Sequence, residues 1–201
     1  MIAAVVLAAG RSTRMGSSKM NLPWKDGRSI IEQVVTILKT GGASPIVVVT
    51  GYNREAIEES LSGLEVELVL NPNYATTEML SSIKVGLQAL VMLEVEAALI
   101  TPGDTPLFQA STVIELIYAW QDGKSQVIAP SYQGRRGHPV LVGREEWGAI
   151  QELDTNRSLR DFLNDRGHTI GYVVVNDPGI YYDLDTLEEY NRAHSEGYND
   201  E

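Results

Sequence analysis

Residues 2–10, Ile-Ala-Ala-Val-Val-Leu-Ala-Ala-Gly, form an unbroken apolar run that ends at a glycine, and Arg11 follows at once. We predict a strand over residues 2–7 of this run. Similar runs at 46–50, 66–70 and 97–101 are followed by Gly, Asn or Pro. Their apolar residues are consecutive rather than alternating, which is typical of strands buried on both faces of a parallel sheet.

Apolar residues at helical spacing fill the segments between these runs. They predict helices over 30–38, ended by Gly41 and Gly42, and over 83–91, with Ser81 and Ser82 as caps. Further helices are predicted at 113–120 and 159–163, and further strands at 127–129 and 171–175. The alternation predicts an α/β protein with a single doubly wound, mostly parallel sheet flanked by helices. The polar, glycine-rich stretch 131–139 is interpreted as a functional loop or an antiparallel excursion.

Length and composition favour one globular domain. The 201 residues, of which 43% are hydrophobic and 21% charged, fit a single domain over 1–201. No Pro/Gly/Ser-rich linker or internal repeat divides the chain, and we expect residues 194–201 to form a flexible tail.

Charge and cysteine content exclude several classes of function. With no Cys, thiol nucleophiles, thiolate zinc sites and disulfides are ruled out. A net charge of −11 disfavours nucleic acid as a partner. No apolar run reaches the length of a membrane span, and the apolar start lacks the basic residues and cleavage site of a signal peptide. We therefore expect a cytoplasmic protein that has neither a nucleic-acid nor a membrane partner.

A basic loop follows the first predicted strand. Residues 11–28 hold five of the 16 basic residues, against one acid: Arg11, Arg14, Lys19, Lys25 and Arg28. Small residues between them suit a backbone that wraps a phosphate chain, which favours an anion site over a merely solvated loop. The segment matches neither a P-loop nor a dinucleotide fingerprint, and the latter mismatch disfavours a dehydrogenase.

Carboxylates follow two other segments. Asp104 comes directly after the predicted strand 97–101, on a loop stiffened by Pro102 and Pro106, which suits a hard cation such as Mg²⁺. Asp183 and Asp185 would share one face of an extended chain. For both sites the competing interpretation is structural: Asp104 would cap a helix or occupy a turn, and Asp185 or Thr186 would cap a helix that contains Leu187 and Tyr190.

A third loop, Gly134-Arg-Arg-Gly-His138-Pro139, combines a restricted backbone with two arginines and a histidine. A lone His is more often structural than catalytic. The combination nevertheless suggests a second anion contact.

Together these segments resemble the molybdopterin-type, or MobA-like, nucleotidyltransferase family. The matching pieces occur in the family's order along nearly the whole chain: 7–16, 19–24, 49–52, 71–74, 79–84, 103–106, 137–139 and 183–186. Thr105 and Leu187 depart from the residues common in the family, but neither change removes a group with expected chemistry.

The resemblance implies a role for each candidate residue. Ala9 and Gly10 would lie near the base and ribose, Arg14 and Lys19 would hold the triphosphate with Arg11 close by, and Ser81 or Ser82 would contact the nucleotide. Asp104 and Asp185 would hold Mg²⁺, with Mn²⁺ as a substitute, and Gly137 and His138 would face the acceptor. Lys19, Arg14 and Asp104 would be the catalytic residues.

The implied reaction is transfer of CMP from CTP to the phosphate of the molybdenum cofactor, with release of pyrophosphate. The product would pass to a molybdoenzyme or its chaperone by transient contact. Two alternatives stay open. One is a guanylyltransferase or sugar-phosphate nucleotidyltransferase of the same fold, and the other is a non-catalytic protein that binds and delivers the cofactor.

Overall fold

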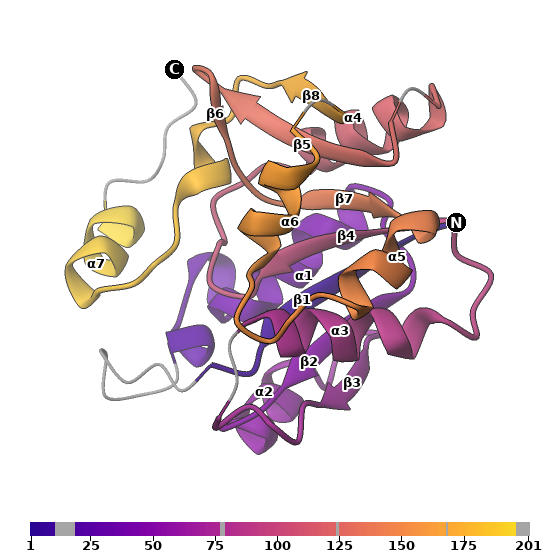
Figure 1. Ribbon diagram of the computed structural model, residues 1–201. Coiled ribbons are helices and arrows are strands. Elements are labelled where there is room, and N and C mark those ends of the chain that lie inside the picture. The colour runs from indigo at the N-terminus through magenta and orange to yellow at the C-terminus, as the bar shows by residue number, and fades with distance from the viewer. Residues whose placement is uncertain (11–18, 77–78, 124, 168, 196–201) are drawn as a thin grey trace.

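The computed structural model describes residues 1–10, 19–76, 79–123, 125–167 and 169–195. Its strands belong to one sheet of order β3-β2-β1-β4-β7-β5-β6, and β8 also pairs with β5 (Figure 1). The strand bounds are β1 (Ile2–Ala8), β2 (Ile46–Thr50), β3 (Glu67–Leu70), β4 (Ala97–Pro102), β5 (Val127–Tyr132), β6 (Arg135–Arg136), β7 (Val140–Gly143) and β8 (Ile170–Val174).

The sheet is mostly parallel. Strands β3, β2, β1 and β4 run parallel to one another, β7 is antiparallel to both β4 and β5, and β8 is parallel to β5. The predicted α/β class is therefore confirmed. The stretch 131–139 is the predicted antiparallel excursion, because it turns back through β6 and leads into β7, a strand that the sequence analysis did not predict.

Helices cover both faces of the sheet. Side chains of α1, α2 and α4 pack in one apolar cluster and those of α3, α5 and α6 in another, and the buried strands contribute to both. The bounds are α1 (Ile30–Thr40), α2 (Arg54–Ser60), α3 (Met79–Leu90), α4 (Ala110–Gln121), α5 (Arg144–Gln151), α6 (Leu159–Asp165) and α7 (Leu187–Ser195). Short 3₁₀ turns lie at η1 (Lys19–Asn21), η2 (Lys25–Gly27) and η3 (Pro178–Tyr181).

One local prediction requires correction. Ser81 and Ser82 do not cap a helix, because α3 begins at Met79 and includes both. Of the tail expected over 194–201, His194 and Ser195 belong to α7. Residues 196–201 lie outside the described residues.

Strand register places the loops of interest together. Leu7 of β1 pairs with Pro102 of β4, so the residues that leave these two strands start side by side. In open α/β sheets, ligands bind outside the carboxyl ends of the strands. Helix α7 lies beyond this end of β1 and β4, at the left of Figure 1. In the described part of the chain, no helix is long and apolar enough to cross a membrane.

Candidate active site

The Lys19 ammonium lies between two carboxylates from distant parts of the chain. Lys19 Nζ forms ion pairs with Asp104 Oδ2 and, at 2.9 Å, with Asp185 Oδ1. The three residues come from η1, from the loop after β4 and from the loop before α7. The structure therefore brings together three of the residues that the sequence analysis proposed for the triphosphate and the metal.

The loop after β4 holds Asp104 rigidly. The Gly103 amide donates to the Leu7 carbonyl at 3.0 Å, which ties the loop to the end of β1. The Thr105 hydroxyl donates to the Pro102 carbonyl at 2.9 Å and contacts the Thr101 hydroxyl at 3.0 Å. Asp104 caps no helix, because α4 begins only at Ala110 with Gln109 as its N-cap. The structural interpretation of Asp104 as a helix cap is wrong.

The second carboxylate loop is fastened to the first. The Leu184 amide donates to the Asp104 carbonyl at 3.1 Å, and the buried Leu184 side chain packs with Trp24 and Ile30. Thr186 takes the capping role, since its hydroxyl accepts from the Glu189 amide at 3.1 Å and the Glu189 carboxylate accepts from the Thr186 amide at 2.9 Å. Thr186 therefore caps α7, and the Asp185 carboxylate pairs with Lys19.

The charges of the cluster perturb one another. Burial of the Lys19 ammonium lowers its pKa, but the carboxylates of Asp104 and Asp185 outweigh this effect and hold the pKa above its ordinary value. Partial burial, together with the charges of Asp104 and Asp185, raises the pKa of Asp183 to about 6. Three carboxylates thus surround one lysine, which leaves an excess of negative charge suited to a further cation.

The oxygen donors fit a magnesium-type ion. Mg²⁺ is usually held by one or two carboxylates together with substrate phosphates rather than by a complete protein cage. Asp104 and Asp185 already hold one cation, the ammonium of Lys19, between them. Among the described residues, no set of three or more His, Asp or Glu side chains is placed to hold a metal.

The proposed nucleotide contacts lie along the ends of β1, β2 and β3. Gly10 is exposed, whereas Ala9 is buried against Gly51, where a Cβ would collide with the Ala9 carbonyl. On α3, Ser81 is half-buried and Ser82 fully buried. Arg11 and Arg14 lie outside the described residues.

Asn71, which lies in the matching piece 71–74 but was given no role in the sequence analysis, organises the two serines. Its Nδ2 donates to Ser81 Oγ at 2.8 Å and to Ser82 Oγ at 3.0 Å, and its Oδ1 accepts from the Asn73 amide. A buried asparagine directly after a strand is the signal that could have identified it.

His138 lines a cavity that Asp183 also lines. The His138 amide donates to the Ile180 carbonyl at 2.8 Å, and Gly137 packs so tightly against Ile180 that a Cβ there would collide. Burial lowers the pKa of the imidazole below its ordinary value, so the ring is neutral at pH 7. Its buried Nδ1 has no hydrogen-bond partner in the described part of the protein. Gly137 and His138 therefore both line this cavity.

The same cavity holds two arginines that the sequence analysis overlooked, Arg157 and Arg160. They lie just before and within α6, whose capping box of Ser158 and Asp161 sets the start of the helix. The sequence signal that could have identified them is their spacing of three residues, which places both arginines near the start of a helix.

Comparison with known proteins supports the fold and the family. The MobA-like NTP transferase domain model matches residues 4–170. The chain is 28% identical over 191 residues to the molybdenum cofactor cytidylyltransferase of Escherichia coli K12, covering 94% of this chain and 93% of that protein.

Solved structures agree. A nucleotidyl transferase from Methanothermobacter superposes with a TM-score of 0.82 at 26% identity, covering 98% of this chain and 97% of that one. Rv0371c of Mycobacterium tuberculosis H37Rv, in complex with manganese, has the same fold, with a TM-score of 0.77 at 24% identity over 96% of this chain and 97% of that one. The chain belongs to the MobA-like NTP transferase family, and it is a nucleotidyltransferase.

Proposed function

We propose that the chain is a divalent-cation-dependent cytidylyltransferase, which transfers CMP from CTP to the terminal phosphate of the molybdenum cofactor and releases pyrophosphate. The observation that carries the chemistry is the convergence of Lys19, Asp104 and Asp185 at the carboxyl ends of β1 and β4. The likeness to the cytidylyltransferase of Escherichia coli supports the choice of base and acceptor.

The reaction needs charge neutralisation and alignment rather than a general base. A phosphate monoester has a second pKa near 6, so at neutral pH the acceptor is already largely a dianion. Its oxygen attacks the α-phosphorus of CTP, the bond from that phosphorus to the bridging oxygen breaks, and the leaving pyrophosphate keeps the electron pair. The neutral His138 imidazole is accordingly not required as a base.

Each residue then has a defined part. Asp104 and Asp185 would bind Mg²⁺ or Mn²⁺, and this cation would neutralise charge on the phosphate oxygens. With a cation held by these carboxylates, the Lys19 ammonium, which now pairs with both, would be available to bind the triphosphate. Arg14, with Arg11 close by, is proposed to bind the same phosphates.

At the nucleotide end, Ser81 is proposed to contact the nucleotide, and Ala9 and Gly10 to flank the base and ribose. Among the two serines, Ser81 is the better candidate for direct contact, because Ser82 is buried beneath it. At the acceptor end, Gly137 and His138 are proposed to form part of the acceptor cavity. After transfer, the product would pass to a molybdoenzyme or its chaperone.

The test is pyrophosphate release with Mg²⁺ and each of the four nucleoside triphosphates, with and without the molybdenum cofactor. Release that requires both CTP and the cofactor is the expected result. Release with GTP in place of CTP would identify the enzyme as a guanylyltransferase. Release with a sugar phosphate in place of the cofactor would identify a sugar phosphate as the acceptor. Tight CTP binding without release in any combination would refute catalysis and favour a delivery protein.

A further inference from the structure

A second concentration of positive charge lies away from Lys19. The cavity that His138 lines has a volume of about 1220 Å³ and is bounded by the β5–β6 turn, β6 and α6. Among the described residues, four arginines line it, in a protein whose net charge is −11: Arg135, Arg136, Arg157 and Arg160. Because the protein as a whole is acidic, this concentration is not a general property of its surface.

Internal partners leave much of this charge unneutralised. Arg157 pairs with Asp165 at 2.6 Å, whereas the Arg136 guanidinium donates to the neutral Asn164 amide at 3.2 Å. Arg135 lies over the ring of Tyr181 at 4.8 Å from its centroid. Among the described residues, no carboxylate forms an ion pair with Arg135, Arg136 or Arg160.

Among the described residues, two acidic side chains line the cavity, and they do not neutralise the arginines. The Asp161 carboxylate is occupied by the α6 capping box, where it accepts from the Ser158 amide at 2.8 Å and from the Ser158 hydroxyl at 2.7 Å. Asp183 lines the same cavity, and its carboxylate interacts electrostatically with those of Asp104 and Asp185. Through Asp183, the cavity therefore adjoins the acidic cluster of the candidate active site.

The lining residues also indicate what kind of ligand the cavity would bind. Apolar side chains from three elements share the cavity with the arginines: Leu80, Val140, Leu159 and Leu163. A cavity of this size exceeds the range of about 300–1,000 Å³ typical of sites for drug-sized molecules. Guanidinium groups bind phosphate and carboxylate oxygens in bidentate fashion. The matching ligand has anionic groups and a bulky, partly apolar body.

We propose that this arginine-lined cavity is the acceptor site, and that Arg135 and Arg160 pair with the anionic groups of a phosphorylated acceptor. The inference rests on the proposed function only for the identity of that acceptor. Asp183 lines the cavity and neighbours Asp104 and Asp185, so an acceptor bound there would lie beside the centre where transfer would occur. The arginines are thus specificity-determining residues that act on the acceptor and not on the nucleotide.

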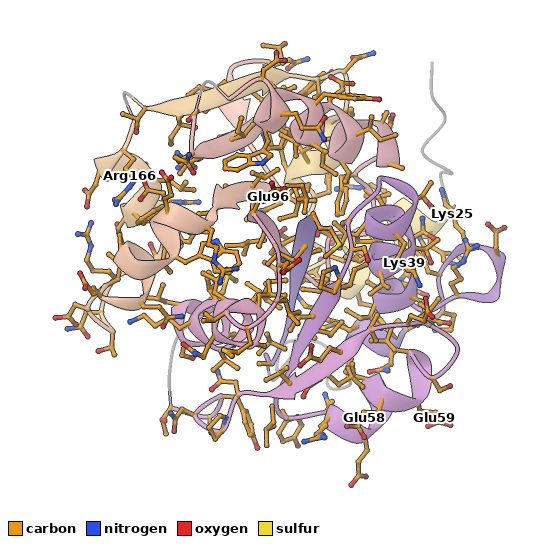
Figure 2. All side chains as sticks on the ribbon, turned by 90° about the vertical axis from the view of Figure 1, so that its right-hand side faces the viewer. Lys25, Lys39, Glu58, Glu59, Glu96 and Arg166 are labelled. Carbon is orange, nitrogen blue, oxygen red and sulfur yellow. The ribbon has the colours of Figure 1, made fainter. Side chains whose placement is uncertain are left out.

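The first experiment needs no turnover. Calorimetric titration with inorganic phosphate, in the presence of saturating CTP and without divalent cations, measures anion binding outside the nucleotide site. Loss of both unpaired guanidinium groups in the Arg135→Gln/Arg160→Gln double variant should weaken phosphate binding at least tenfold. Lys39→Gln is the matched control. Figure 2 shows Lys39, near the end of α1, on the opposite side of the molecule from Arg166, which follows α6.

The second experiment is steady-state turnover with the molybdenum cofactor. The double variant should raise the KM for the cofactor at least tenfold and leave the KM for CTP unchanged. Unchanged phosphate affinity in the double variant would overturn the proposal, and so would an equal rise in the KM for CTP. A third result would separate the two claims. If the protein never turns over the cofactor but the double variant loses phosphate binding, the anion site is supported and the molybdenum cofactor is refuted as the acceptor.

Discussion

Replacing Lys19 by Met removes the cation that two carboxylates share, so we expect a loss of both stability and turnover. The side chains of Lys19 and Asp104 are only 12% and 13% exposed, whereas that of Asp185 is 49% exposed. Removing one partner of a buried ion pair costs about 3 kcal/mol, and a half-exposed pair adds less than about 1 kcal/mol. We therefore expect the free energy of unfolding to fall by about 3 kcal/mol at pH 7.5.

Urea unfolding measures this difference, and its dependence on pH and Mg²⁺ tests the cause. Since the folded state raises the pKa of Lys19 above 10.5, the stabilisation is fully present below pH 10.5 and is lost as the pH rises through the raised value. Mg²⁺ should restore part of the stability of the variant by replacing the ammonium. At ten times its dissociation constant, it would contribute about 1.4 kcal/mol.

Two control variants isolate the role of the buried charge. Lys39→Met makes the same change at an exposed pair with Glu65, 3.8 Å away, and should leave stability essentially unchanged. Lys19→Arg keeps the charge and should retain more stability than Lys19→Met. A loss in Lys19→Met no larger than that in Lys39→Met would refute the reasoning, as would turnover close to that of the unmodified protein.

Four further predictions follow from the same structure. Asp104→Asn should abolish Mg²⁺-dependent pyrophosphate release without unfolding the protein, and an unchanged Mg²⁺ dependence would remove this residue from the site. Because the folded state raises the pKa of Asp183 from 3.8 to about 6, its ionisation destabilises the protein progressively between these two pH values and fully above the higher one. After allowance for solvent screening, Asp183→Asn should stabilise by about 1 kcal/mol at pH 7.5 and by nothing well below pH 3.8 in urea titrations. Gly86→Ala forces a methyl group against two valines of the sheet and should lower the free energy of unfolding by about 2 kcal/mol. Gly148→Ala, in open space on α5, should instead raise it by up to about 1 kcal/mol, and equal effects in thermal melts would contradict this packing account. We also propose that the chain is a single domain, so fluorescence and circular dichroism should report one coincident unfolding transition, and two separate transitions would contradict it.

The central part of the fold was predictable because its strands are buried on both faces. Consecutive apolar residues predicted 46–50 as observed, and the first and fourth strands were one residue too short. The antiparallel strand β7 was missed because it is only four residues long and follows a glycine-rich loop. Ser81 and Ser82 were misread as caps because sequence alone does not show that Asn71 bonds to both hydroxyls within a helix.

The candidate site was predictable where chemistry and position coincide. Asp104 and Lys19 stand out because each follows a predicted strand in a loop of unusual composition. The choice of Asp185 over Asp183 rested on resemblance, and the structure pairs Asp185 with Lys19. Arg160 was missed because its role depends on a cavity formed between α6 and a distant hairpin, and local patterns carry no information about such contacts.

The most direct test of the central claim follows the phosphorus atoms of CTP. The protein is incubated with Mg²⁺, the molybdenum cofactor and CTP labelled at either the α- or the γ-phosphorus. The account predicts that the α label appears in the cofactor and the γ label only in pyrophosphate. In the Asp104→Asn variant, both labels should stay in CTP. Retention of the α label in free CMP, or transfer of the γ label to the cofactor, would contradict it.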